Sequence, residues 1–105
     1  MNIQDLEYKA DEAAEFLGLM SSPHRLRILC LLIEGEMSVG ELAETAKIRQ
    51  SAVSQHLALL RAHKIVSSRR EGTTVFYSVD HPGAEAVIKT LHSVYCGPTK
   101  ASRKK

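Results

Sequence analysis

The sequence predicts a mainly α-helical fold with one small β-hairpin. Apolar residues recur at helical spacing along most of the chain, and Ser38 with Glu41 forms the capping-box pattern that begins a helix. Two segments rich in β-branched and aromatic residues flank a turn at residues 71–73. Because 105 residues can bury only one modest core, we expect a single domain over residues 1–96, followed by a disordered basic tail over residues 97–105.

Two helices are predicted before residue 36. The first carries one apolar stripe, because its apolar residues recur at spacings of four and three: Leu6, Ala10, Ala13, Leu17 and Met20. The second begins at Ser21 and Ser22 before Pro23, which are typical of an N-cap and a first-turn proline, and ends at Gly35. Its continuous apolar run over residues 28–33 predicts a central core helix that packs on several sides.

The next two helices form a helix-turn-helix pattern. A short helix begins at the capping box and ends near Lys47, and a tight connection at residues 48–50 leads into a helix from about Gln50 to His63. The second helix places Val53, Leu57 and Leu60 on one side. Its opposite side is small and polar, with these residues at its centre and flank: Ser51, Ser54, Gln55, Ala58 and Ala62. Such a pair of helices is typical of helix-turn-helix proteins.

A hairpin and a last helix complete the order of a winged helix-turn-helix. Residues 65–70 and 74–79 are the predicted strands, and they form the wing, with Arg69 and Arg70 near its tip. The last helix runs from about Pro82 to Tyr95. The first and last helices are both amphipathic, and one small core cannot cover both apolar stripes. We therefore expect a homodimer that forms through these two helices; in the alternative, both stripes fold back onto the core of their own chain.

Charge is distributed unevenly along the sequence. Residues 1–46 carry nine acidic side chains against three basic ones. Residues 47–70 have no acidic side chain and six basic ones: Lys47, Arg49, Arg61, Lys64, Arg69 and Arg70. In a helix-turn-helix protein this cluster predicts contact with a polyanion, double-stranded DNA, whereas a solvated charged surface is the alternative.

The sequence carries no pattern of a membrane protein. No apolar run approaches the length of a membrane span, and the acidic N-terminus lacks the apolar segment of a secretory signal. We therefore expect a cytoplasmic protein without a membrane partner. The two cysteines argue against a structural disulfide framework there, because that compartment is reducing.

Three segments carry a resemblance to a known family. They are residues 19–29 (LMSSPHRLRIL), 38–43 (SVGELA) and 50–57 (QSAVSQHL), followed by VFYS at residues 75–78 of the wing. Together they resemble the ArsR/SmtB family of small repressors over about residues 8–96. The resemblance implies a dimeric repressor whose effector lowers its affinity for the operator.

Within that family, the surroundings of Cys30 and Cys96 are similar to those in the persulfide-sensing BigR/SqrR branch. The similarity implies that the second and last helices pack so that Cys30 meets Cys96. It also implies that the two thiols sense reactive sulfur, a persulfide or polysulfide, by closing a bridge. On the residues alone, the alternative is a small core residue at Cys30 and an incidental cysteine at Cys96, because neither neighbourhood activates a thiolate.

The resemblance also assigns DNA contacts to the helix after the turn, and we add basic residues beside it. The candidates are Arg49, Gln50, Ser51, Ser54, Gln55, His56, Arg69 and Arg70. Ser51 and Gln55 are the strongest base readers, because both face away from the apolar side. His56 lies beside that side, so a histidine at the core edge is the alternative. Arg49 stands where the family often has a capping Ser, and we expect it to contact a phosphate instead.

No metal ligand or other cofactor is predicted. Ser38 and Gly40 stand where the cysteines of metal-sensing relatives would fall, and neither binds a soft metal. Asp80 is followed directly by His81, which departs from the Asp-x-His of the family's other metal site. A zinc-binding pair of His81 and His92 is the alternative.

The remaining alternatives change the function rather than the fold. One is a repressor of the same family with structural cysteines and no thiol signal. A second is a thiol enzyme with Cys30 as nucleophile and His92 or His24 as base, although the sequence has no glycine-rich anion loop and we predict no catalytic residue. A third is a protein-interaction module that keeps the winged fold without binding DNA.

Overall fold

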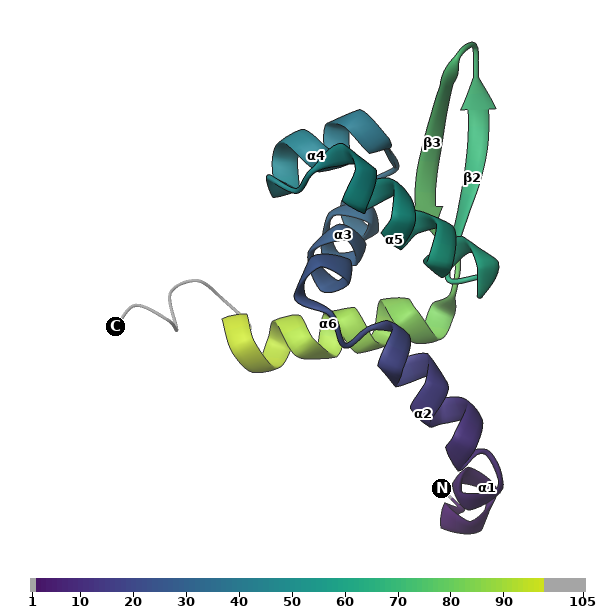
Figure 1. Cartoon of the computed structure of the whole chain (residues 1–105). Coiled ribbons are helices and arrows are strands. Elements are labelled where there is room, and N and C mark those ends of the chain that lie inside the picture. Colours follow the sequence, from purple (N-terminus) through teal and green to yellow (C-terminus); the bar gives the residue numbers. More distant parts are fainter. Residues whose placement is uncertain (1, 98–105) are drawn as a thin grey trace.

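The computed structural model describes residues 2–97, which form a winged helix-turn-helix as predicted (Figure 1). The elements in chain order are α1 (Ile3–Tyr8), α2 (Ala10–Leu19), α3 (Pro23–Glu34), β1 (Met37–Ser38), α4 (Val39–Ala46), α5 (Gln50–Ala62), β2 (Val66–Glu71), β3 (Thr74–Val79) and α6 (Pro82–Cys96). The wing of β2 and β3 projects beside α5, and α1 and α2 extend away from the packed body. Apart from Gly97, the predicted tail lies outside the described residues.

The first helix was predicted as one continuous element, and this is wrong. The chain breaks at Lys9, where φ is −103° and ψ is 12°, and the amide of Lys9 donates to the carbonyl oxygen of Leu6 at 3.0 Å. Neither α1 nor α2 contains a buried residue. Because a short helix in a protein is held mainly by packing of its apolar side, nothing here forces the two segments into one straight helix.

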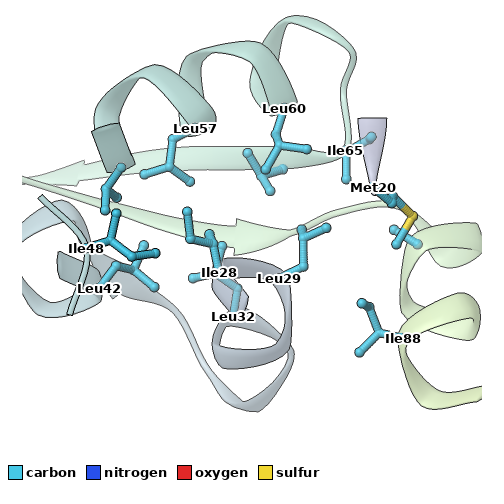
Figure 2. Close-up of a cluster of buried hydrophobic side chains, with 13 residues drawn as sticks. Met20, Ile28, Leu29, Leu32, Leu42, Ile48, Leu57, Leu60, Ile65 and Ile88 are labelled. Carbon is cyan, nitrogen blue, oxygen red and sulfur yellow. The ribbon is translucent and has the colours of Figure 1, made fainter. Parts of the chain in front are cut away.

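The core lies between α3 and α5. Figure 2 shows Leu57 and Leu60 of α5 pointing toward Ile28, Leu29 and Leu32 of α3. The helix α3 begins as predicted, with the Ser22 hydroxyl accepting a hydrogen bond from the Arg25 amide and Pro23 in the first turn. The prediction that residues 28–33 pack on several sides is only partly correct, because Cys30 in the middle of the run is exposed.

The sheet has a third strand that the sequence pattern did not indicate. The two residues of β1 pair antiparallel with β3, Met37 opposite Tyr77 and Ser38 opposite Phe76, so the strand order is β1-β3-β2. Two residues are too few for a periodic pattern. Ser38 also caps α4: its hydroxyl accepts from the Glu41 amide at 3.2 Å, and its amide donates to the Glu41 carboxylate at 2.9 Å, which confirms the capping box.

The last helix is fixed at its start by His81. Its Nδ1 accepts a hydrogen bond from the Ala84 amide at 3.1 Å, and its ring stacks on Phe16 of α2 at 4.9 Å between centroids. Within residues 2–97, no three histidine, cysteine or acidic side chains gather as a metal site would require. Over the same residues no single helix is long and apolar enough to cross a membrane, although α2 and α3, which meet at 87°, would suffice together by length and composition.

Candidate functional site

The turn between α4 and α5 sets the position of the predicted reading helix. Lys47 ends α4 in the left-handed conformation, with φ of 58°. Arg49 is the N-cap residue of α5, and its side chain makes no capping hydrogen bond, as the sequence predicted. Its carbonyl oxygen accepts from the amides of Ala52 and Val53 at 3.0 Å. The Arg49 side chain is therefore not used to cap α5, and it is exposed to solvent.

The outer side of α5 is open. Gln50, Ser51, Ser54 and Gln55 are all exposed, whereas Val53 and Leu57 on the opposite side are completely buried. Because the buried side is held against α3, the helix presents its small polar side to solvent without strain on the core. The arrangement leaves amide and hydroxyl groups free to meet an external partner.

His56 lies at the edge of the core rather than on the open side. It is half-buried, its Nδ1 is 3.4 Å from Nη1 of Arg25, and its ring meets His24 edge-on at 5.8 Å between centroids. Burial lowers the pKa of His56, and the neighbouring charges of Arg25 and His24 lower it further. These contacts favour a neutral imidazole and fit the core-edge alternative.

The two wing arginines lie on opposite faces of the sheet. Side chains alternate along a strand, so Arg70 lies on the same face as Ser68. Ser68 pairs with Tyr77 of β3, and Tyr77 packs against the core. Arg69 shares the other face with Phe76, and its guanidinium lies 5.0 Å from the centre of the Phe76 ring. Arg69 also forms ion pairs with two carboxylates, whereas Arg70 forms no ion pair with any residue from 2 to 97.

A hollow of about 410 Å³ separates α5 from the wing. Its lining residues come from the flank of the open side of α5 and from β3: Ser54, Ala58, Arg61, Ala62 and Tyr77. A hydroxyl, a guanidinium and a phenol thus border one depression, and the two alanines leave it open. Groups of this kind hydrogen-bond phosphate oxygens.

The two cysteines are carried by helices that pack against each other, α3 and α6. Cys30 is exposed and Cys96, the last residue of α6, is half-buried; both are free thiols. Partial burial raises the pKa of Cys30, and the charges of Cys96 and Glu34 raise it further. Cys96 is therefore near enough to influence Cys30 electrostatically, but the surroundings keep the Cys30 thiol protonated rather than activating it.

Open space lies on both sides of Cys30. A hollow of about 310 Å³ toward α6 is lined by Cys30, Ile33, Glu34, Ile88, Lys89 and His92. A second of about 450 Å³ toward α4 is lined by Leu26, Arg27, Cys30, Leu31, Thr45 and Ala46. A small molecule can therefore approach this thiol from solvent. Of the two histidines considered as a base, His92 borders the first hollow, while His24 contacts His56 instead.

Comparison with known proteins identifies the family. A model of the arsR family of bacterial regulatory proteins matches residues 22–68. The chain is 44% identical over 96 residues to the transcriptional activator HlyU of Vibrio cholerae, covering 91% of this chain and 89% of that protein. The chain belongs to the ArsR family. It is also 38% identical over 100 residues to the biofilm growth-associated repressor of Xylella fastidiosa, covering 95% of this chain and 88% of that protein.

Solved structures of ArsR-family relatives share the fold. The transcriptional repressor BigR from Xylella fastidiosa superposes with a TM-score of 0.86 at 38% identity, covering 91% of this chain and 98% of that chain. Reduced HlyU from Vibrio cholerae gives a TM-score of 0.82 at 43% identity, covering 89% of this chain and 98% of that chain. The predicted family and fold are thus confirmed, and this ArsR-family chain is a transcriptional regulator.

Two residues that line the hollow between α5 and the wing were not among the predicted DNA contacts, although Arg61 belongs to the predicted basic cluster of residues 47–70. Arg61 stands on the flank of α5 with Ser54 and Ala58, at spacings of four and three along the helix, and that spacing could have assigned it to the same surface. No pattern in the sequence predicts that Tyr77 lies near α5, because its position there depends on how the wing packs against that helix.

Proposed function

We propose that the protein is a cytoplasmic, homodimeric repressor that binds an operator in double-stranded DNA and releases it when reactive sulfur bridges Cys30 and Cys96. The observation that carries the DNA-binding part is the exposed polar side of α5. The wing projects beside this helix and carries Arg70, an exposed arginine without an ion pair within residues 2–97. Bases and phosphates can be reached from this one surface. The relatives named above include both an activator and repressors, and we assign repression to this protein by its similarity to the repressor BigR.

Base reading and phosphate contact fall to different residues in this proposal. Ser51 and Gln55 have hydrogen-bonding groups suited to base edges in the major groove. Arg49, Arg61 and Arg70 supply positive charge around them, and phosphates bound there fix the register of the protein on DNA. Arg69 contributes less, because two carboxylates already neutralise it.

Exposed apolar side chains support the homodimer. Ile3, Leu6 and Leu17 of α1 and α2 and Val94 and Tyr95 of α6 are each more than half exposed. Several large apolar side chains exposed on the terminal helices of a small domain are typical of a protein interface. A two-fold axis through these helices would present two copies of α5 to successive turns of DNA. A possible ArsR-family regulator from Mycobacterium bovis, 26% identical, is described as a homodimeric winged helix-turn-helix domain.

The sulfur signal requires a balanced thiol reaction. One cysteine thiolate attacks the sulfane sulfur of a persulfide, forming a cysteine persulfide and releasing the donor as a thiol. The second cysteine thiolate then attacks Sγ of the first cysteine, the inner sulfur of that persulfide, which closes a disulfide and releases the outer sulfur as hydrosulfide. The two protein thiols are oxidised, and the sulfane sulfur is reduced. A second donor molecule would leave one additional sulfur in the bridge.

The experiment begins by selecting a duplex from a random library with the reduced protein. We expect affinity for that duplex to fall steeply with salt, and glutathione persulfide to lower it roughly 5- to 150-fold, the usual range of coupling between two sites. Intact mass should show the loss of two hydrogens, with or without added sulfur. The variants Cys30→Ser and Cys96→Ser should keep DNA binding and lose the response. If Cys96→Ser were released as readily as the wild type, the bridge would be excluded.

One observation favours a second candidate function. The raised pKa of Cys30 makes this thiol a weak nucleophile near neutral pH, as expected for a regulator with structural cysteines and no thiol signal. In that case the selected duplex is still bound, but neither persulfide nor oxidised glutathione changes the mass or the affinity. An absence of any salt-dependent binding would instead favour the protein-interaction module.

A further inference from the structure

The α3–β1 connection is tied to the wing by a side-chain cluster that DNA binding alone does not require. Nε of Arg69 on β2 donates to both carboxylate oxygens of Glu36 at 3.0 Å, and Nη2 contacts the same carboxylate. Nη1 donates to Glu71 at 3.2 Å. The guanidinium also lies over the Phe76 ring. Such a paired arginine holds a defined orientation, because its planar fork matches a carboxylate.

The sheet register shows how far this contact reaches. Ser38 of β1, Phe76 of β3 and Arg69 of β2 lie in one row across the three strands. Arg69 must therefore cross β3 over the Phe76 ring to meet Glu36, which comes directly before β1. The contact joins the outer strand of the wing to the opposite edge of the sheet. Arg69 also lowers the pKa of the Glu36 carboxyl by hydrogen bonding, so the pair is charged at neutral pH.

Glu36 follows the end of the helix that carries Cys30. Cys30 precedes Glu34, the last residue of α3, by about one turn, and only Gly35 separates Glu34 from Glu36. A tilt or shift of α3 at Cys30 therefore moves Glu36. The same movement of α3 also reaches β3, because β1 is paired with β3 through the backbone. The Glu36 side chain contacts the next strand, β2, which carries Arg70.

We propose that Glu36 is a positioning residue through which α3 sets the position of the wing. The Glu36–Arg69 pair transmits a change at Cys30 to β2 and so to Arg70, on the opposite face of the same strand. This inference rests on the proposed function for its signal, but the mechanical link between α3 and the wing can be tested without sulfur or DNA.

The direct test compares Glu36→Gln with Glu71→Gln. Both substitutions remove a carboxylate from Arg69, but only Glu36 is attached to α3. Amide hydrogen exchange in β2 is measured before and after Cys30 is alkylated with iodoacetamide in a Cys96→Ser background. We expect alkylation to change hydrogen exchange in β2 of the Cys96→Ser protein and of the same protein with Glu71→Gln. In the protein with Glu36→Gln, the change should be much smaller. An equal response with and without the Glu36 carboxylate, including no response in either, overturns the proposal.

DNA affinity provides the second measurement. The ratio of dissociation constants for the bridged and the reduced protein on the selected duplex should be about threefold smaller in Glu36→Gln than in wild type, as expected for an exposed ion pair of good geometry. Glu71→Gln should keep the wild-type ratio. The double variant with Glu36→Arg and Arg69→Glu should restore part of it. If persulfide leaves the DNA affinity of the wild-type protein unchanged while alkylation of Cys30 still changes exchange in β2 through Glu36, the sulfur signal is refuted. The link between α3 and the wing is then retained.

Discussion

The middle of the chain and its two ends use the same amphipathic pattern with opposite results. In α5, Val53, Leu57 and Leu60 are fully buried, whereas α1 and α2 bury no residue at all. At the other end, Val94 and Tyr95 of α6 are 68% and 79% exposed. An apolar stripe thus indicates that a helix needs a partner surface, and the fold decides whether that surface lies in the same chain. The middle buries its apolar side within one chain, whereas the ends leave large apolar side chains exposed.

The largest effect is expected where the middle is most tightly packed. Leu57→Ala should lower the free energy of unfolding by about 2–5 kcal/mol, because it removes buried methyl groups and leaves a cavity. Urea denaturation at fixed protein concentration measures this. The matched substitution at the end of the chain, Leu17→Ala, removes the same atoms from a side chain that is 53% exposed, and should cost far less in a dilute monomer. Equal losses would contradict the comparison.

The ends should respond through association instead. Leu17→Glu or Val94→Glu places a charge in the proposed interface, where it is costly to bury. We expect the dimer to dissociate at least roughly tenfold more readily, equivalent to about 1.4 kcal/mol, by sedimentation velocity over a concentration series. Glu15→Gln, on the opposite side of α2 from Leu17, is the control and should leave association unchanged. A wild-type chain that stays monomeric at high concentration would mean that the exposed stripes serve another partner.

On the open side of α5, substitutions should change DNA binding without changing stability. Gln55→Ala should cost about 1–3 kcal/mol on the selected duplex and little on unrelated DNA, because it removes a proposed base contact. Arg61→Gln should instead weaken binding to both and reduce the log–log salt slope by about 0.9, the contribution of one phosphate. Titrations at several salt concentrations separate the two results. Identical behaviour of both variants would argue against this division of roles.

The smallest effect concerns pH. Because the pKa of His56 is lowered in the folded protein, the unfolded chain takes up the proton first as pH falls. His56 therefore favours folding fully above its ordinary pKa of about 6.5, and this contribution is lost as pH falls toward the lower folded value. Unfolding measured between pH 7.5 and 5 should show a steeper decline in wild type than in His56→Gln. Arg25 and His24 contribute by lowering the pKa of His56, so His56→Gln removes their part of the effect together with the imidazole.

Local patterns in the sequence were sufficient for most of the fold. The capping box at Ser38 and the polar side of α5 each depend on residues within a few positions of one another, and both lie where the pattern predicted. The break at Lys9 was missed because it reflects absent packing, which a periodic stripe does not report.

Features that depend on distant residues could not be predicted. The pairing of Arg69 with Glu36 joins positions 33 apart in sequence, and the hollow beside Tyr77 exists only once β3 lies against α5. Both arginines of the wing looked equivalent in the sequence. Alternation along β2 places them on opposite faces, and only the strand register shows that Arg69 shares its face with Phe76 and Arg70 shares its face with Tyr77.

The stack of Phe16 on His81 has a consequence for how two chains would meet. It fastens α2 to the beginning of α6 within a single chain. Both apolar ends are thereby oriented before association, so less conformational freedom is lost at the moment of binding. In the proposed dimer the stack holds α2 and α6 in a fixed relative orientation. The exposed helices then meet the partner chain as one preorganised surface rather than as two independently moving segments.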